Sequence, residues 1–230
     1  PVSLAPPFNL AIADARVTKL TITNAGAKNV IDDVRFKLSG NKQQWELRDA
    51  SALTPWGRAT ASGSIGSMRP FKLDAAAALV QTQVKAGQAP AQLSIRAGGD
   101  LVATQINAAG QAGKAVGDMR LTLAPFEAVP LRALALKGRN INPGFFNPAL
   151  PAADLSMSVT AQIDPKKAIS GTVDIANDGK VGPIDKQLLP LLSMRGRLGG
   201  NLSAMQIDDV LLDMGAAGKF TGGGTVQRGL

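Results

Sequence analysis

A short alternation of apolar and polar residues recurs along most of this chain and constrains its fold more than any other feature. It is plain in Leu155–Ile163 (LSMSVTAQI), in residues 119–123 (MRLTL) and in residues 71–79 (FKLDAAAAL), with Gly, Pro, Asn and Asp between such segments. A period of two places every second side chain on one face of a β-strand. The pattern predicts an all-β protein whose strands share one apolar face.

The same reading along the chain predicts a series of strands separated by turns, with little helix. Helical character is limited to residues 183–192, where apolar residues cluster and Pro190 ends the run after about two turns. The segment at residues 138–151 contains three prolines and is predicted to be a loop, because proline removes ladder hydrogen bonds. The predicted strands are residues 8–13, 17–23, 31–38, 45–47, 58–65, 71–80, 92–97, 101–108, 119–123, 131–137, 155–163, 169–176, 194–197, 205–214 and 219–227.

The composition favours a thin or open core. Apolar residues make up 45% of the chain and aromatic residues only 4%, with no Tyr, so much of the apolar share is Ala. Alanine adds little buried area to a core, and a closed sandwich of 230 residues would use more large side chains. We therefore expect an elongated curved sheet with an apolar interior, forming a single continuous segment over residues 1–230.

An internal echo supports a repetitive sheet. Ile31-Asp32-Asp33-Val34 returns as residues 207–210, also Ile-Asp-Asp-Val, and each copy is followed by a further strand. Neighbouring residues of a strand point to opposite faces, so neither pair of aspartates converges on one point. We expect a hairpin-edge or solvated position for both pairs rather than an acid–base or cation site.

The sequence offers no catalytic constellation. With no Cys and no His, the chain lacks disulfides, thiolate ligands and the commonest general base and metal ligand. Its serines are not set in a Gly-x-Ser-x-Gly turn. The formal net charge of +8 is spread over strand faces and turns, without a basic stripe carrying aromatic residues for nucleic acid. We predict a protein that is not an enzyme and has no cofactor, no metal and no nucleic-acid partner.

The candidate site is therefore the apolar face itself. Trp56, Phe145 and Phe146 lie in turns or loops, where they either fill a local core or form a lid or cap over a groove. The residues predicted to line the groove are Val34, Phe36, Leu38, Phe71, Leu73, Leu93, Ile95, Leu121, Leu123, Leu155, Met157, Val159, Val173 and Ile175.

Several segments resemble the TamB family, within the AsmA-like group of bridge-like lipid transfer proteins. They are residues 54–59 (TPWGRA), 70–74 (PFKLD), 123–126 (LAPF), 136–143 (LKGRNINP) and 218–224 (GKFTGGG). The resemblance implies a β-taco, which is a sheet folded over a hydrophobic channel, in the periplasm of Gram-negative bacteria. It implies roles in outer-membrane assembly and phospholipid transport within the translocation and assembly module. It also implies a parent protein with an inner-membrane anchor and an Omp85-type barrel partner, contacted through another part of the parent.

The residue pattern and the resemblance lead to one expected function. The chain begins with Pro1 and in mid-pattern, so we interpret it as part of that longer parent. Exposing an acyl chain to water costs about 0.8 kcal/mol per methylene, which an apolar trough would avoid while the phosphate stays near Lys and Arg. We expect a periplasmic conduit segment that shields phospholipid acyl chains between the inner and outer membranes.

Two alternatives remain open at this stage. One is a purely structural β-spacer or closed sandwich with a dry core. The strands of a groove and of a sandwich have the same alternation of apolar and polar residues, so the pattern does not distinguish them. The other is a chaperone-like scaffold that adds strands of unfolded outer-membrane proteins to its sheet edge.

Overall fold

The computed structural model describes residues 3–24, 27–84, 89–147, 149–201 and 203–227. The chain divides into two compact units. Unit 1 comprises Pro1–Gly113 and Leu123–Ala128, and unit 2 comprises Lys114–Thr122 and Val129–Leu230.

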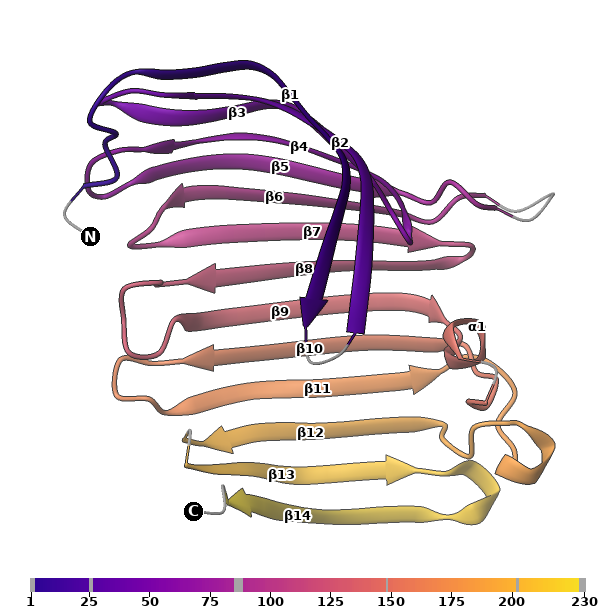
Figure 1. The fold of residues 1–230 in the computed structure, drawn as a ribbon. Helices are drawn as coiled ribbons and strands as arrows, with labels where there is room; N and C mark the ends of the chain where they lie inside the picture. The colour runs from indigo at the N-terminus through magenta and orange to yellow at the C-terminus, as the bar shows by residue number, and fades with distance from the viewer. Residues whose placement is uncertain (1–2, 25–26, 85–88, 148, 202, 228–230) are drawn as a thin grey trace. The chain divides into compact units, whose positions relative to one another are not determined.

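Both units are built from antiparallel strands. Strand residues make up 69% of the chain and helical residues 4%, which confirms the prediction of an almost entirely β protein. Within the described residues there are fourteen strands, and within each unit a strand is hydrogen-bonded to the strands next to it in sequence; Figure 1 shows this order. Such neighbours need only short turns, which the Gly, Asn, Asp and Pro residues between the alternating segments supply.

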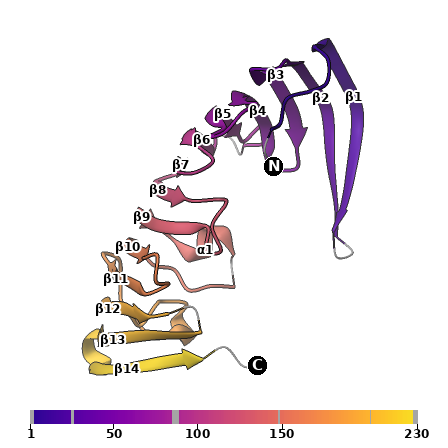
Figure 2. The same cartoon turned by 90° about the vertical axis from the view of Figure 1, so that its left-hand side faces the viewer.

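The strands of unit 1 form an arch (Figure 2), with β1 and β2 on one limb and β5 to β7 on the other. A sheet of this kind has a concave and a convex face, so alternate side chains meet different surroundings. The unit holds β1 (Leu10–Asn24), β2 (Ala27–Gly40), β3 (Gln44–Thr54), β4 (Gly57–Gly66), β5 (Lys72–Val80), β6 (Gln92–Asp100) and β7 (Thr104–Ala112).

Unit 2 contains the remaining strands and three short helical turns, with the last residue of β8 assigned to unit 1. Its elements are β8 (Ala115–Leu123), β9 (Leu131–Ile141), α1 (Pro143–Phe146), β10 (Leu155–Ile163), β11 (Ile169–Asn177), η1 (Ile184–Lys186), β12 (Ser193–Gly200), β13 (Ala204–Asp213), η2 (Gly215–Ala217) and β14 (Lys219–Gln227).

The helical turns agree in part with the sequence prediction. The 3₁₀ turn η1 lies inside residues 183–192, as expected, but α1 and η2 were not predicted. The turn α1 forms inside the predicted proline-rich loop because Pro143 occupies its first position and the Asn142 side chain accepts a hydrogen bond from the Gly144 backbone N–H at 3.0 Å. Among the described residues, no helix has the length and apolar character needed to span a membrane.

Two strand boundaries differ from the prediction for local reasons. Residues 10–13 and 17–23 belong to one strand, β1, because the break between them is a shift in register between Ile12 and Ala15, and residues 8 and 9 of the predicted strand precede β1. The turn between β6 and β7 lies at residues 101–103, whereas the predicted strands 92–97 and 101–108 place it at residues 98–100. It forms there because the Asp100 carboxylate accepts hydrogen bonds from the Val102 and Ala103 backbone N–H groups at 2.8 and 2.9 Å.

The second aspartate of each Ile-Asp-Asp-Val segment lies in a β-bulge. Asp33 has φ 48° and Asp209 has φ 50°, and the strand register shifts at both positions. The left-handed region is open to Asp and Asn at low cost, and a bulge increases the local twist of the strand. Asp49 and Asn140 occupy the same kind of position, with φ 52° and 54°. These short polar residues therefore mark the bulges of the sheet.

A substitution pair at Asp33 tests this role. Asp33→Val places a β-branched residue in the left-handed region and should lower the free energy of unfolding by roughly 1–3 kcal/mol. Asp33→Asn keeps that conformation accessible and loses only the exposed ion pair with Arg35, so it should cost less than about 1 kcal/mol. Urea unfolding of both variants provides the comparison, and equal losses would show that the bulge conformation is unimportant.

Candidate functional site

The strand register of unit 1 gathers apolar side chains on one face. Directly paired residues of neighbouring strands lie on the same face of a sheet. Leu79 of β5 pairs with residues of both β4 and β6, and so does Ala77. The two cross-strand rows that result are Ala59–Leu79–Leu93 and Ala61–Ala77–Ile95.

The opposite face of unit 1 is polar and carries ion pairs on β2 and β3. The Lys37 ammonium lies 2.7 Å from the Asp49 carboxylate, and the Arg48 guanidinium donates to Glu46 at 2.7 Å. The hydrogen bond from Lys37 lowers the pKa of Asp49, and the hydrogen bond from Arg48 lowers the pKa of Glu46. Both carboxylates are therefore ionised at neutral pH, and this face interacts with water rather than with apolar groups.

A cavity of about 520 Å³ lies on the apolar face of unit 1. Its lining comes from β2 to β6, and β2 and β6 lie on opposite limbs of the arch in Figure 2, so the cavity lies inside the arch. Phe36, Leu79 and Leu93 are large lining residues, whereas many of the other lining positions on β3, β4 and β5 are alanines. Because folded interiors are close-packed, a hollow of this size above small side chains has room for a ligand.

Trp56 lines this cavity from the turn between β3 and β4, although its side chain is 64% exposed. The turn is held by Thr54, whose hydroxyl donates to the Gly57 carbonyl at 2.9 Å and accepts from the Trp56 backbone N–H at 3.3 Å. Gly57 has φ 145°, and a Cβ there would lie 2.1 Å from the Val80 carbonyl oxygen, so only glycine fits. The turn thus fixes one of the predicted cap residues at the cavity mouth.

The structure brings some of the predicted lining residues of unit 1 together. Val34, Phe36, Leu93 and Ile95 all line the cavity. Leu38 shares their face further along β2, where it pairs with Leu47 of β3. Leu73 likewise lies further along β5, paired with Ile65 of β4.

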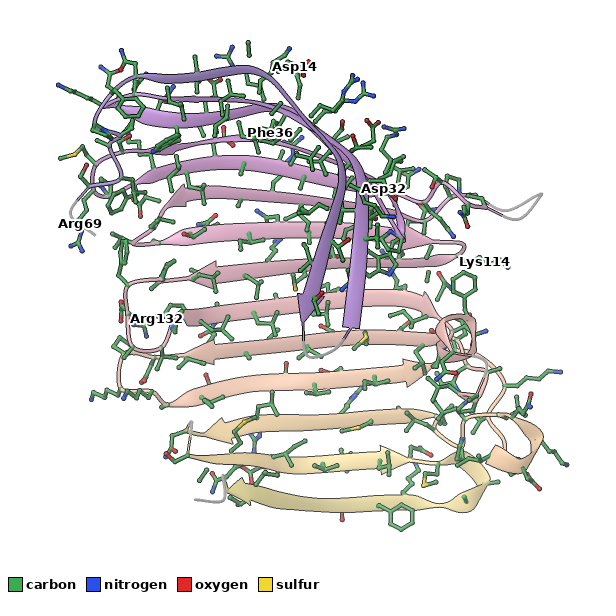
Figure 3. The ribbon with its side chains drawn as sticks, viewed as in Figure 1. Asp14, Asp32, Phe36, Arg69, Lys114 and Arg132 are labelled. Atoms are coloured by element: carbon green, nitrogen blue, oxygen red, sulfur yellow. The ribbon has the colours of Figure 1, made fainter. Side chains whose placement is uncertain are left out.

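Phe71, by contrast, is not among the residues that line the cavity. It lies in the turn before β5 with φ 58°, so the alternation of the strand does not set its direction. Its side chain is 0% exposed and packs on Phe126, with ring centroids 5.8 Å apart. The Arg69 guanidinium lies 5.1 Å from the centroid of the Phe126 ring. Figure 3 labels Arg69 at this end of the strands. Phe71 is therefore a core residue that closes this end of the strands.

Unit 2 presents a similar apolar face. Met157 pairs with Ile175 and Val159 pairs with Val173, so four predicted lining residues form two adjacent cross-strand pairs. Leu155 begins the same face of β10, and Leu121 and Leu123 lie half-buried in β8. The residues between them carry polar contacts, such as the hydroxyl oxygens of Thr160 and Thr172, which lie 2.9 Å apart.

The two phenylalanines predicted as a lid or cap lie in α1 of unit 2. The Phe145 side chain is 56% exposed. The Phe146 backbone completes the helical turn, and its side chain lies outside the described part of the structure. The cavity described above is formed within unit 1, so neither residue is part of it.

Two buried polar anchors were not predicted from the sequence. The Trp45 indole N–H donates to the Leu4 carbonyl at 2.8 Å and ties the N-terminal segment to β3. Asn177, only 4% exposed, accepts from the Asp154 and Gly179 backbone N–H groups and donates to the Leu191 carbonyl at 3.0 Å. The position of Asn177 before an Asp-Gly pair is typical of a turn, but no neighbouring residue in the sequence indicated that its side chain joins three segments.

The cavity lining is almost free of ionisable side chains. Arg35 is the one titratable residue of the cavity lining, and it alternates with Val34 and Phe36, so its side chain points to the polar face. Within the described ranges, no three acidic side chains are grouped in a way that would hold a metal ion. Comparison of the chain with models of protein families, with curated proteins and with solved structures found no match.

A pair of truncations distinguishes the core from the cavity face. Phe71→Ala removes a fully buried ring and should lower the free energy of unfolding by roughly 3–5 kcal/mol. Leu93→Ala should cost only about 1 kcal/mol, because this side chain is already 38% exposed. Urea titrations give both values. If Leu93→Ala were as costly as Phe71→Ala, Leu93 would belong to a closed dry core instead.

Proposed function

We propose that the apolar face of this protein binds the acyl chains of phospholipids and serves as a conduit segment for them between two membranes. The observation that carries the proposal is the cavity of about 520 Å³ on the apolar face of unit 1. Polar, charge-paired residues occupy the other face of the same strands, so ligand and solvent would meet opposite sides of one sheet.

The energetics of the lining support an acyl ligand. Each methylene moved from water to an apolar surface gains about 0.8 kcal/mol. Covering the exposed parts of Leu93 and Trp56 adds to this gain, since both side chains now contact water. The attraction is non-directional, so the Val, Leu, Ile, Phe and Ala side chains of the lining do not hold an acyl tail in one fixed register.

The setting of the proposal is a periplasmic one. The sequence resemblance to the TamB family supports a longer parent anchored in the inner membrane, with an Omp85-type barrel as its outer-membrane partner. The net charge of +8 suits anionic phosphate head groups at the groove margin. The apolar pairs of unit 2, such as Val159–Val173, would serve the same role as the face of unit 1.

Filling the cavity tests the proposal, and the chain offers a matched control. Ala77 faces the cavity, whereas its neighbour Ala76 lies on the polar face, opposite Ser62 and Arg96. Ala77→Leu should weaken binding of a fluorescent fatty-acyl phospholipid by about tenfold, because the new side chain displaces about two methylenes of the ligand. Ala76→Leu should leave the affinity nearly unchanged.

Circular dichroism and urea unfolding establish that both variants retain the fold. Equal affinities for the two folded variants would contradict an acyl site in this cavity. So would the absence of saturable binding by the unsubstituted protein.

A further inference from the structure

The two tryptophans of unit 1 differ in the state of their indole N–H groups. That of Trp45 is satisfied by the Leu4 carbonyl oxygen at 2.8 Å. That of Trp56 has no hydrogen-bond partner among the described residues, and only its backbone N–H is bonded, to Thr54. Trp56 therefore offers a free donor on a ring that otherwise forms part of an apolar lining.

The Trp56 indole N–H lies at one end of the cavity. Trp56 precedes β4, whose inward residues continue through Ala59 and Ala61 to Gly63, the partner of Leu47. These positions carry no polar side chain. The Thr54 hydroxyl at the same end already donates to Gly57 and accepts from Trp56, so it has little capacity left for a ligand.

The far end of the strands is closed by protein. Phe71 is fully buried there against Phe126, and the N-terminal segment is held by the bond between Trp45 and Leu4. A ligand with one polar end and one long apolar end could thus place its polar end at the Trp56 donor and its apolar end on the apolar lining in the opposite direction.

We propose that Trp56 determines the orientation of the bound amphiphile: its indole N–H donates a hydrogen bond to an oxygen of the ligand's polar end, and the acyl tail runs along the strands towards Leu47. This inference rests on the proposed function. An ester carbonyl, a carboxylate or a phosphate oxygen supplies the acceptor, and the Thr54–Gly57 turn holds the backbone that carries the donor, which lowers the cost of ordering it.

Fluorescence quenching tests the orientation directly. In a Trp45→Phe variant, Trp56 is the sole tryptophan, because the chain has two. Stearic acid carrying a nitroxide near its carboxylate should quench Trp56 more strongly than stearic acid carrying it near the terminal methyl. The same difference should be obtained by subtracting the signal of Trp56→Phe from that of the unsubstituted protein, which covers the case of an unstable Trp45→Phe variant.

A substitution tests the hydrogen bond itself. Trp56→Phe keeps an aromatic ring at the turn and removes the donor, so affinity for stearate should fall by roughly three- to tenfold. Affinity for the n-alkane of the same chain length, which has no acceptor oxygen and no charge, should stay within about twofold. An equal loss for both ligands would show that Trp56 acts through its ring alone and would overturn the proposed bond.

The outcomes separate this inference from the proposed function. Saturable binding with equal quenching, or with stronger quenching by the label near the methyl group, would overturn the orientation and leave the acyl site standing. No saturable binding of either fatty acid would remove the acyl site, and the orientation with it.

Discussion

An antiparallel sheet with apolar side chains on alternate positions has one face that must be removed from water, and the structure of unit 1 follows from how that face is covered. The arch brings β2 towards the limb that carries β6, so Val34 and Phe36 share a cavity with Leu93 and Ile95. Alanines between these residues are too small to fill the space. The result is partial coverage, in which Leu93 keeps 38% of its surface exposed.

Coverage differs between the two ends of the strands. At the end that carries Phe71, a buried aromatic pair and the N-terminal segment replace water with protein. At the other end, a turn fixed by Thr54 and Gly57 holds an exposed tryptophan beside the cavity. The strands therefore have one end covered by protein and one end at which an aromatic residue contacts both solvent and the apolar lining, which suits the proposed binding of an amphiphile.

The sequence was most informative where structure is local. The hairpin of β10 and β11 agrees with the prediction to within one residue, because alternation and a short turn suffice to define it. The shared apolar face followed from the same period of two. Features that depend on distant contacts could not be predicted: the register that opens a cavity above Ala77, the bond from Trp45 to Leu4, and the burial of Phe71, which the alternation placed on the strand. The repeated Asp-Asp pair marks two of the bulges in the sequence. Only the backbone angles show that these aspartates lie in bulges.

Site-specific photo-crosslinking reports directly which face of the sheet meets lipid. A photoreactive amino acid would be placed at Leu93 and Val173 on the apolar face, and at their neighbours Ser94 and Thr172 on the polar face. After irradiation with phospholipid vesicles, mass spectrometry would count lipid adducts at each position. If the apolar face binds lipid, we expect adducts at Leu93 and Val173 and background levels at Ser94 and Thr172. Equal capture from both faces, or capture from the polar face alone, would contradict it.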